Sequence, residues 1–203
     1  LDKAGVDIVK FQIAAGKLCR TFVKSAISYP TFSCVVECSQ SAKELKLMSV
    51  ADGGIKSPSC VCKAIAAGST FVMLGSLFIG YEQNEGNWHH KRKVLHRGTP
   101  EYDKWYENIS KTDNIQAELI VSNEIEKDYI IGYGMSSKEA NDKYNGGLAN
   151  YRAAEGISQR FPYKGDINVL LDDIEGGMRS CCTYTNSKSI AELSDNATFI
   201  RLK

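Results

Sequence analysis

The residues with the clearest capacity for chemistry lie in the stretch FQIAAGKLCRTF, residues 11–22, where an apolar run ends and Cys19 follows a glycine-containing turn. A cysteine thiolate is a strong nucleophile, and the nearby positive charges of Lys17 and Arg20 favour the thiolate form. A free cysteine is, however, more often a small buried apolar side chain. The stretch alone therefore leaves two interpretations of Cys19, a nucleophile or a buried residue.

Small and polar residues also end two later apolar runs. Asp52-Gly53-Gly54 ends the run 46–54, and Gly75-Ser76 lies in the run 70–80. Most such pairs are simple turns. At the carboxyl ends of parallel strands, however, glycine and serine let a ligand approach the backbone, whose N–H groups can bind phosphate. Together with Cys19, these turns indicate one ligand crevice.

The elements that must position these residues follow from the apolar pattern. Short β-branched runs predict strands at 6–13, 46–54 and 70–80, and helical periodicity predicts helices at 29–45 and 57–69. Each connection is long enough for a parallel crossover. The first 80 residues are therefore expected to form an α/β unit with a parallel sheet.

The rest of the chain is less regular. Residues 81–130 are polar and charged and are interpreted as a surface insertion, helical around PEYDKWYENI. In residues 131–203, the turn GYGMSS places Ser136 or Ser137 to cap a helix that begins with KEANDKY. Arg152 and Glu155 would share a face if their segment were helical. Residues 169–193 are expected to form two helices around a Gly-Gly bend. We expect one domain over residues 1–203.

Composition excludes several classes of protein. The formal net charge is +1, which gives no sign of a nucleic-acid partner or a membrane surface. No apolar run approaches the roughly 20 residues that a membrane-spanning helix needs. The first ten residues lack the pattern of a signal peptide. The seven cysteines are an odd number, which argues against a framework of disulfides. Cys34 and Cys38 have a helical spacing, but the histidines lie far from them in the sequence, which argues against zinc. We therefore expect reduced thiols in a cytoplasmic protein.

Several ordered motifs resemble one family. The matching stretches are AGKLCRT, SVADGG, AIAAGSTFVMLGS, GYGMSS, YRAAEG, PYKGD, GGMRSCCTY and the terminal ATFIRLK. The barrel motifs are similar to those of IMP dehydrogenase, whereas YRAAEG, PYKGD, GGMRSCCTY and TFIRL look specifically like GMP reductase. The chain therefore resembles the GMP reductases over most of its length except 81–130.

The resemblance implies a fold and a reaction. The fold would be a TIM (β/α)8 barrel, here only its C-terminal strands and helices with the flap and the tail, because the similarity begins at about the sixth strand. The reaction would be the NADPH-dependent reductive deamination of GMP to IMP and ammonia, in a homotetramer with a potassium ion near the cysteine loop. The alternatives are an IMP dehydrogenase-like oxidoreductase that uses NAD, and a truncated inactive relative that binds nucleotide.

The resemblance also implies roles for individual residues. Those matching the catalytic group are Cys19, Thr21 and Glu155. Those matching the GMP/IMP site are Asp52, Gly53, Gly54, Gly75, Ser76, Gly134, Met135, Ser136, Arg152, Ala153, Ala154, Glu155 and Gly156. Contacts to the nicotinamide cofactor match Met135, Tyr151, Arg152, Ser180, Cys181, Cys182 and Thr183, the last four in an expected turn. Gly16 and Cys19 match the potassium site.

The cysteine loop departs from the family's pattern. The family's form is G-x-G-P-G-S-x-C, whereas residues 12–19 read QIAAGKLC. Only Gly16 remains of three glycines, and Lys17 stands where a serine donates to the GMP phosphate. Loss of a glycine at a positive φ is expected to strain the loop, and Lys17 is expected to change how the phosphate is recognised.

Overall fold

A three-stranded parallel sheet organises the amino-terminal part of the protein. The structure, a computed structural model, describes residues 4–108 and 119–200. Strands β1 (Ile8–Phe11), β2 (Met48–Asp52) and β3 (Phe71–Met73) pair in the order β1-β2-β3. The predicted strands are thus confirmed, although each is shorter than its apolar run. Because the strands are parallel, their carboxyl ends meet at one edge of the sheet.

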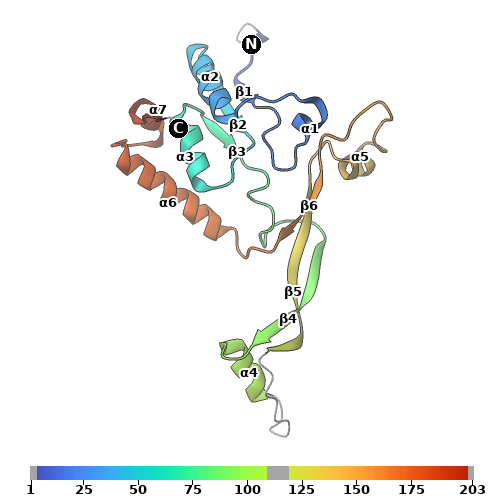
Figure 1. The fold of residues 1–203 in the computed structure, drawn as a ribbon. Coiled ribbons are helices and arrows are strands. Elements are labelled where there is room, and N and C mark those ends of the chain that lie inside the picture. Colours follow the sequence, from blue (N-terminus) through green and yellow to red (C-terminus); the bar gives the residue numbers. More distant parts are fainter. Residues whose placement is uncertain (1–3, 109–118, 201–203) are drawn as a thin grey trace.

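Helices α2 (Thr31–Glu44) and α3 (Pro58–Ala66) connect these strands, as the periodicity predicts. Val35 on α2 packs with Ala51 of β2 and Ala64 of α3 in one buried cluster. Met178 and Leu193 from the carboxyl-terminal part pack against the opposite side of α3. Figure 1 accordingly shows α3 between the sheet and α6 (Asn168–Tyr184). The α/β class is confirmed, and the strands in the described ranges form no closed barrel.

A long antiparallel arm leads away from the parallel sheet (Figure 1). Strand β4 (Trp88–His96) pairs with β5 (Leu119–Tyr133), and β5 pairs with β6 (Ser158–Pro162) near the body. Helix α4 (Pro100–Asn108) forms where sequence predicts a helix. The three strands were not predicted, because a ribbon exposed on both faces needs no clean alternation of apolar and polar residues.

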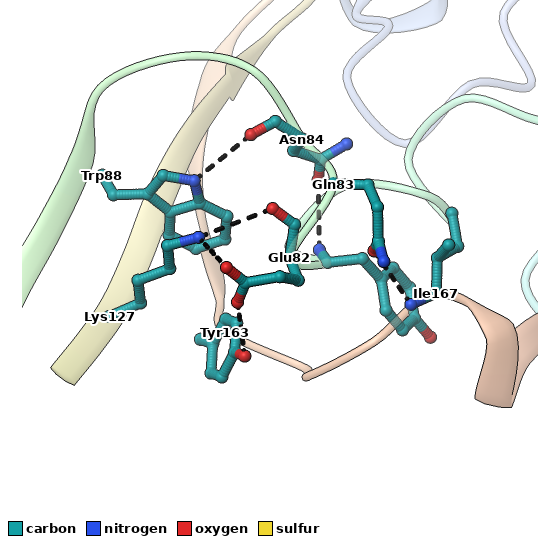
Figure 2. Close-up of polar contacts among 8 residues, drawn as sticks. Glu82, Gln83, Asn84, Trp88, Lys127, Tyr163 and Ile167 are labelled. Atoms are coloured by element: carbon teal, nitrogen blue, oxygen red, sulfur yellow. Dashed lines mark hydrogen bonds and ion pairs between the residues drawn. The ribbon is translucent and has the colours of Figure 1, made fainter.

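The base of the arm is held by polar contacts around Glu82 (Figure 2). Its carboxylate accepts hydrogen bonds from Lys127 Nζ at 2.5 Å and from Tyr163 Oη at 2.6 Å. The Lys127 ammonium also lies 4.9 Å from the centre of the Trp88 ring. Trp88 Nε1 donates to the Asn84 carbonyl at 3.2 Å. These contacts join β4, β5 and the segment after β6 to the loop that follows β3.

One expectation for the carboxyl-terminal part is wrong, and the condition attached to a second is not met. The residues expected to form two helices around a Gly-Gly bend begin with the single helix α6, and Gly176 and Gly177 lie inside it. A Cβ on Gly177 would lie 3.2 Å from Pro58 Cβ at the start of α3, so this glycine permits close helix packing. The segment 151–156 is not helical, so Arg152 and Glu155 do not share a helix face.

Short helices complete the fold. They are α1 (Thr21–Ser25), which was not predicted, α5 (Lys138–Tyr144), the 3-10 helix η2 (Ile190–Glu192) and α7 (Leu193–Asn196). Ser137, not Ser136, caps α5, because its side-chain oxygen accepts from the Ala140 N–H at 3.1 Å. Within residues 4–108 and 119–200, no helix combines the length and apolar character required to cross a membrane.

The cap of α5 provides a stability test. Ser137 is 1% exposed, so Ser137→Ala leaves the Ala140 N–H without its partner in a buried place. We expect a loss of about 1–2 kcal/mol in the free energy of unfolding, measured by urea denaturation. Ser136→Ala, at the exposed neighbouring position, is the control and should change stability by less than about 0.5 kcal/mol. Equal losses in both variants would contradict the assignment.

Candidate active site

Backbone pairing holds the cysteine loop against a distant segment. Cys19 N–H closes a tight turn onto the Gly16 carbonyl at 3.0 Å. On either side of Cys19, the Arg20 N–H donates to the Glu155 carbonyl at 2.5 Å, and the Leu18 carbonyl accepts from the Ile157 N–H at 3.0 Å. Cys19 and Gly156 thereby form an antiparallel bridge. This pairing fixes the position of Cys19 relative to the segment that carries Glu155.

The segment that carries Glu155 pairs on its other side with the turn at residues 134–136, here called the flap turn. Gly156 N–H donates to the Ser136 carbonyl and Gly134 N–H to the Ile157 carbonyl, both at 3.1 Å. A Cβ on Gly156 would lie 2.6 Å from Ser137 N, and one on Gly134 would lie 2.9 Å from the Leu18 carbonyl oxygen. Real Cβ atoms do not approach backbone atoms so closely. Glycine is therefore required at both positions for the three segments to meet.

Three side chains form a continuous hydrogen-bonded series in this place. The Cys19 thiol lies 3.2 Å from Thr21 Oγ1 and donates to it, and the Thr21 hydroxyl donates to Glu155 Oε2 at 2.6 Å. Residue Thr21 begins α1, while Glu155 comes from the segment paired with the loop. A proton can pass along such a series between sulfur and carboxylate. The structure thus brings together the three predicted catalytic residues.

The turn after β2 forms the facing wall. Gly53 has φ +90°, and a Cβ there would lie 3.1 Å from Gly16 N and 3.2 Å from Ala15 Cβ. Glycine therefore lets the two turns pack against each other. Asp52 forms an ion pair with Lys10, with 2.5 Å between Lys10 Nζ and Asp52 Oδ2. We did not predict Lys10, although a lysine inside an otherwise apolar strand is a sequence signal for such a partner.

These segments enclose a cavity of about 380 Å³, a size suited to a small-molecule ligand. Its lining contains most of the predicted substrate and catalytic residues. Apolar lining residues that sequence reasoning missed are Leu18, Ile55, Met73 and Leu74, which carry no distinctive pattern. The predicted residues in the lining are Gly16, Cys19, Thr21, Asp52, Gly53, Gly54, Gly75, Ser76, Gly134, Met135, Ser136, Glu155 and Gly156.

Other predicted residues lie outside this lining. Arg152, Ala153 and Ala154 belong to the segment that leads to Glu155, and Tyr151 before them is 89% exposed. The residues 180–183 lie within α6 and not in the expected turn, because the helix continues through them. Cys181 and Cys182 pack against the buried cluster that contains α3 residues. The roles of Arg152, Ala153 and Ala154 in substrate binding, and of Tyr151, Arg152 and residues 180–183 in cofactor binding, stay predictions.

The cysteine loop is strained where the family's glycines are missing. Gln12 has φ 126° and Ala14 has φ 62°, values that glycine adopts without cost. The side-chain amide of Gln12 is also buried, and neither its nitrogen nor its oxygen has a hydrogen-bond partner in the described part of the chain. The expected strain at this loop is thus present.

The other thiols differ in acidity. Burial, together with the Cys38 sulfur at 3.8 Å, raises the pKa of Cys34 to about 11. Burial also raises the pKa of Cys62. For Cys60, burial acts upward, but hydrogen bonds from Ser57 and the backbone and the charge of Lys63 outweigh it, so the pKa of this thiol is lowered. Cys60 therefore competes with Cys19 for general electrophiles.

Relief of the loop strain is measurable. Gln12→Gly removes an unfavourable φ, which stabilises the folded state by about 1–3 kcal/mol, and it also removes an unpartnered buried amide. The added conformational freedom of the unfolded chain costs about 0.5–1 kcal/mol of stability. We expect a net gain of about 1–3 kcal/mol in the free energy of unfolding, by urea denaturation. Ile13→Gly, at an exposed position without positive φ, is the control and should lower stability. A less stable Gln12→Gly protein would refute the strain.

The thiol acidities predict an order of alkylation. At pH 8 a thiol of pKa about 11 is roughly one part in a thousand thiolate. Cys60, with a pKa below its ordinary value, should react with iodoacetamide faster than Cys34. Peptide mass mapping over time measures both rates. The Cys34 rate should rise about tenfold per pH unit towards pH 11; comparable rates at pH 8 would contradict the prediction.

Comparisons with known proteins agree on one family. The family model described as "IMP dehydrogenase / GMP reductase domain" matches residues 1–100 and 107–203. The chain is 38% identical over 199 residues to a GMP reductase of Caenorhabditis elegans, with 98% of this chain and 46% of that protein covered. It is 38% identical over 200 residues to a GMP reductase of Vibrio cholerae, covering 98% and 48% respectively.

The fold has a solved counterpart. It is the crystal structure of a cysteine-to-alanine variant of GMP reductase from Trypanosoma brucei in complex with guanosine 5′-monophosphate. The TM-score is 0.74 at 24% sequence identity, over 99% of this chain and 35% of that one. This chain spans about half the length of the curated relatives that it matches. By the match over nearly all its residues, the chain belongs to the IMP dehydrogenase/GMP reductase family.

Proposed function

We propose that the protein carrying this chain converts GMP to IMP and ammonia with NADPH as reductant, as a GMP reductase. The observation that supports this best is the series of Cys19, Thr21 and Glu155 inside the cavity. The curated relatives that match along the chain are GMP reductases, and the solved counterpart is a complex with GMP. The remaining half of such a protein would supply the other strands of a TIM barrel.

The cavity offers matched surfaces for a nucleotide. In the proposal, backbone N–H groups at Gly53–Gly54 and Gly75–Ser76 hold the phosphate, and the Asp52 carboxylate accepts from ribose hydroxyls. The ion pair with Lys10 holds the Asp52 carboxylate in place. The purine would lie between Cys19 and the flap turn at 134–136, with the segment 152–156 on its other side. The base would then meet the sulfur within one enclosed space.

The side-chain series accounts for the proton in the first step. The Cys19 sulfur forms a bond to purine C2, the bond from C2 to the amino nitrogen breaks, and the thiol's proton ends on the departing ammonia. Thr21 and Glu155 would carry that proton, since the thiol already donates to Thr21 and Thr21 to Glu155. The product of this step is a purine bonded covalently to Cys19.

The residues at the mouth of the cavity fit a nicotinamide ring. Met135 lines the cavity and is 71% exposed, so it presents an apolar surface to solvent beside Cys19. Tyr151 and Arg152 precede Glu155 on an exposed segment and could extend this surface. When bound, NADPH supplies the two electrons and the hydrogen that take the place of sulfur at C2, which releases IMP. Met135 would hold the ring, and closure of the flap would exclude water.

The match of Gly16 and Cys19 to the family's potassium site stays a proposal by resemblance. The carbonyl of Gly16 accepts one hydrogen bond, from the Cys19 N–H, and keeps a second lone pair. Residues 4–108 and 119–200 contain no group of three or more His, Cys, Asp or Glu side chains that could hold a metal ion. We therefore assign no step to a cation. A homotetramer remains our proposal by family resemblance alone.

A spectrophotometric assay tests the proposal. The full protein that carries this chain should consume NADPH when GMP is added and should release ammonia and IMP. Cys19→Ala should lower turnover by at least about 1,000-fold, while Thr21→Val and Glu155→Gln should lower it by about 100-fold or more. GMP affinity by calorimetry should change by less than about threefold in Cys19→Ala, because the sulfur acts after binding.

Other outcomes distinguish the alternatives. Formation of NADH from IMP and NAD would identify an IMP dehydrogenase-like enzyme instead. GMP binding without turnover would favour the inactive nucleotide-binding relative, for which the strained residues Gln12 and Ala14 are the supporting observation. GMP should also protect Cys19, and not Cys60, from labelling by 6-chloropurine ribonucleotide. Equal protection of both thiols, or of neither, would contradict the proposed position of the base.

A further inference from the structure

Two ammonium groups lie beside the cavity without a carboxylate partner. Lys17 Nζ lies 4.7 Å from the centre of the Phe161 ring on β6. Lys164 follows β6 by two residues, and its Nζ donates to the Leu77 carbonyl at 3.2 Å and lies 4.8 Å from the centre of the Tyr81 ring. Lys17 thus lies against β6 and Lys164 lies in the segment directly after that strand, where the positive charge of Lys17 acts on it.

This pair differs from the other lysine at the base of the arm. Lys127 also lies over aromatic rings, but the Glu82 carboxylate neutralises it. Neither Lys17 nor Lys164 forms an ion pair with a carboxylate in the described ranges. Partial desolvation and, after it, the positive charge of Lys17 lower the pKa of Lys164. An anion beside the two ammonium groups would favour their charged forms.

The pair adjoins the wall assigned to the phosphate. Lys17 is itself a lining residue of the cavity, beside Gly16. Lys164 binds the carbonyl of Leu77, the residue directly after the lining pair Gly75–Ser76. Each ammonium has three N–H donors, and the contacts to Phe161 and Leu77 leave donors free on both. The cationic pair therefore continues the phosphate wall outward from the cavity.

We propose that Lys17 and Lys164 form an additional phosphate subsite, so that this pocket binds a guanosine 5′-diphosphate more tightly than the monophosphate. This inference rests on the proposed function, because it takes the nucleotide and its first phosphate from there. The α-phosphate occupies the turns at 53–54 and 75–76, and the β-phosphate accepts from the two ammonium groups. Charge-assisted hydrogen bonds of this kind are stronger than neutral ones.

Calorimetric titration of the full protein with GMP and with GDP tests the inference. The wild-type protein should bind GDP at least about tenfold more tightly than GMP, since one or two charge-assisted hydrogen bonds are added. Lys17→Ser and Lys164→Met should each reduce this preference to less than about threefold, and in Lys164→Met the GMP affinity should change much less than the GDP affinity. Lys188→Met, which removes an equal charge in the loop between α6 and η2, is the control and should keep the preference.

The outcomes separate this inference from the function on which it rests. GMP bound and turned over without a preference for GDP, or a preference that survives both lysine substitutions, overturns the subsite alone. Failure of both nucleotides to bind the folded wild-type protein overturns the proposed function and the subsite with it. If a variant unfolds, the wild-type salt dependence decides: raising KCl from 0.05 to 0.5 M should weaken GDP more than GMP, and equal weakening overturns the inference.

Discussion

The backbone pairing of residues 155–157 is the interaction on which the candidate site depends. This short segment hydrogen-bonds to the cysteine loop on one side and to the flap turn on the other. Its two pairing partners, the cysteine loop and the flap turn, precede it in the sequence by about 140 and about 20 residues respectively. Without it, Glu155 would have no fixed relation to Cys19, and the thiol-to-carboxylate series of 3.2 Å and 2.6 Å would not form. Geometry at the sulfur is thus set by main-chain contacts, not by the side chains that do the chemistry.

That arrangement is possible only because side chains are absent at its centre. Gly134 and Gly156 lie where a Cβ would meet backbone atoms, and Gly53 lets the turn after β2 pack on the cysteine loop. The loop itself shows the opposite case, since Gln12 and Ala14 adopt positive φ without being glycine. The packed glycines define the cavity, whereas the strained residues lower the stability of the loop that carries Cys19. Glycine thus permits the close backbone contacts around the cavity, whereas Gln12 and Ala14 adopt a positive φ at a cost in conformational energy.

The sequence predicted those features that arise from local pattern. The strands around Ala51 and Val72 pair in a parallel sheet, for which short β-branched runs are typical. The ordered family motifs predicted the residues that line the cavity. The sequence did not reveal the arm, because β4 and β5 bury little and carry charges such as Lys91 that pair across the ladder with Glu126. Gly176 and Gly177 wrongly predicted a bend, because a glycine pair is a local signal for one. In the structure Gly177 instead permits close packing of α6 against Pro58.

The roles of charged side chains were harder to predict than the strands and helices, because the role of a lysine depends on the group that its ammonium contacts in the fold. Lys10 in β1 and Lys127 in β5 each face a carboxylate, Asp52 and Glu82, so each charge is satisfied within the fold. From the sequence, Lys17 was interpreted as a charge that favours the Cys19 thiolate and as a change in phosphate recognition. The structure turns its ammonium towards the Phe161 ring, where an aromatic face, not an acid, receives it. An aromatic face stabilises a cation without neutralising it, so the positive charge at this wall of the cavity stays available to an anionic ligand.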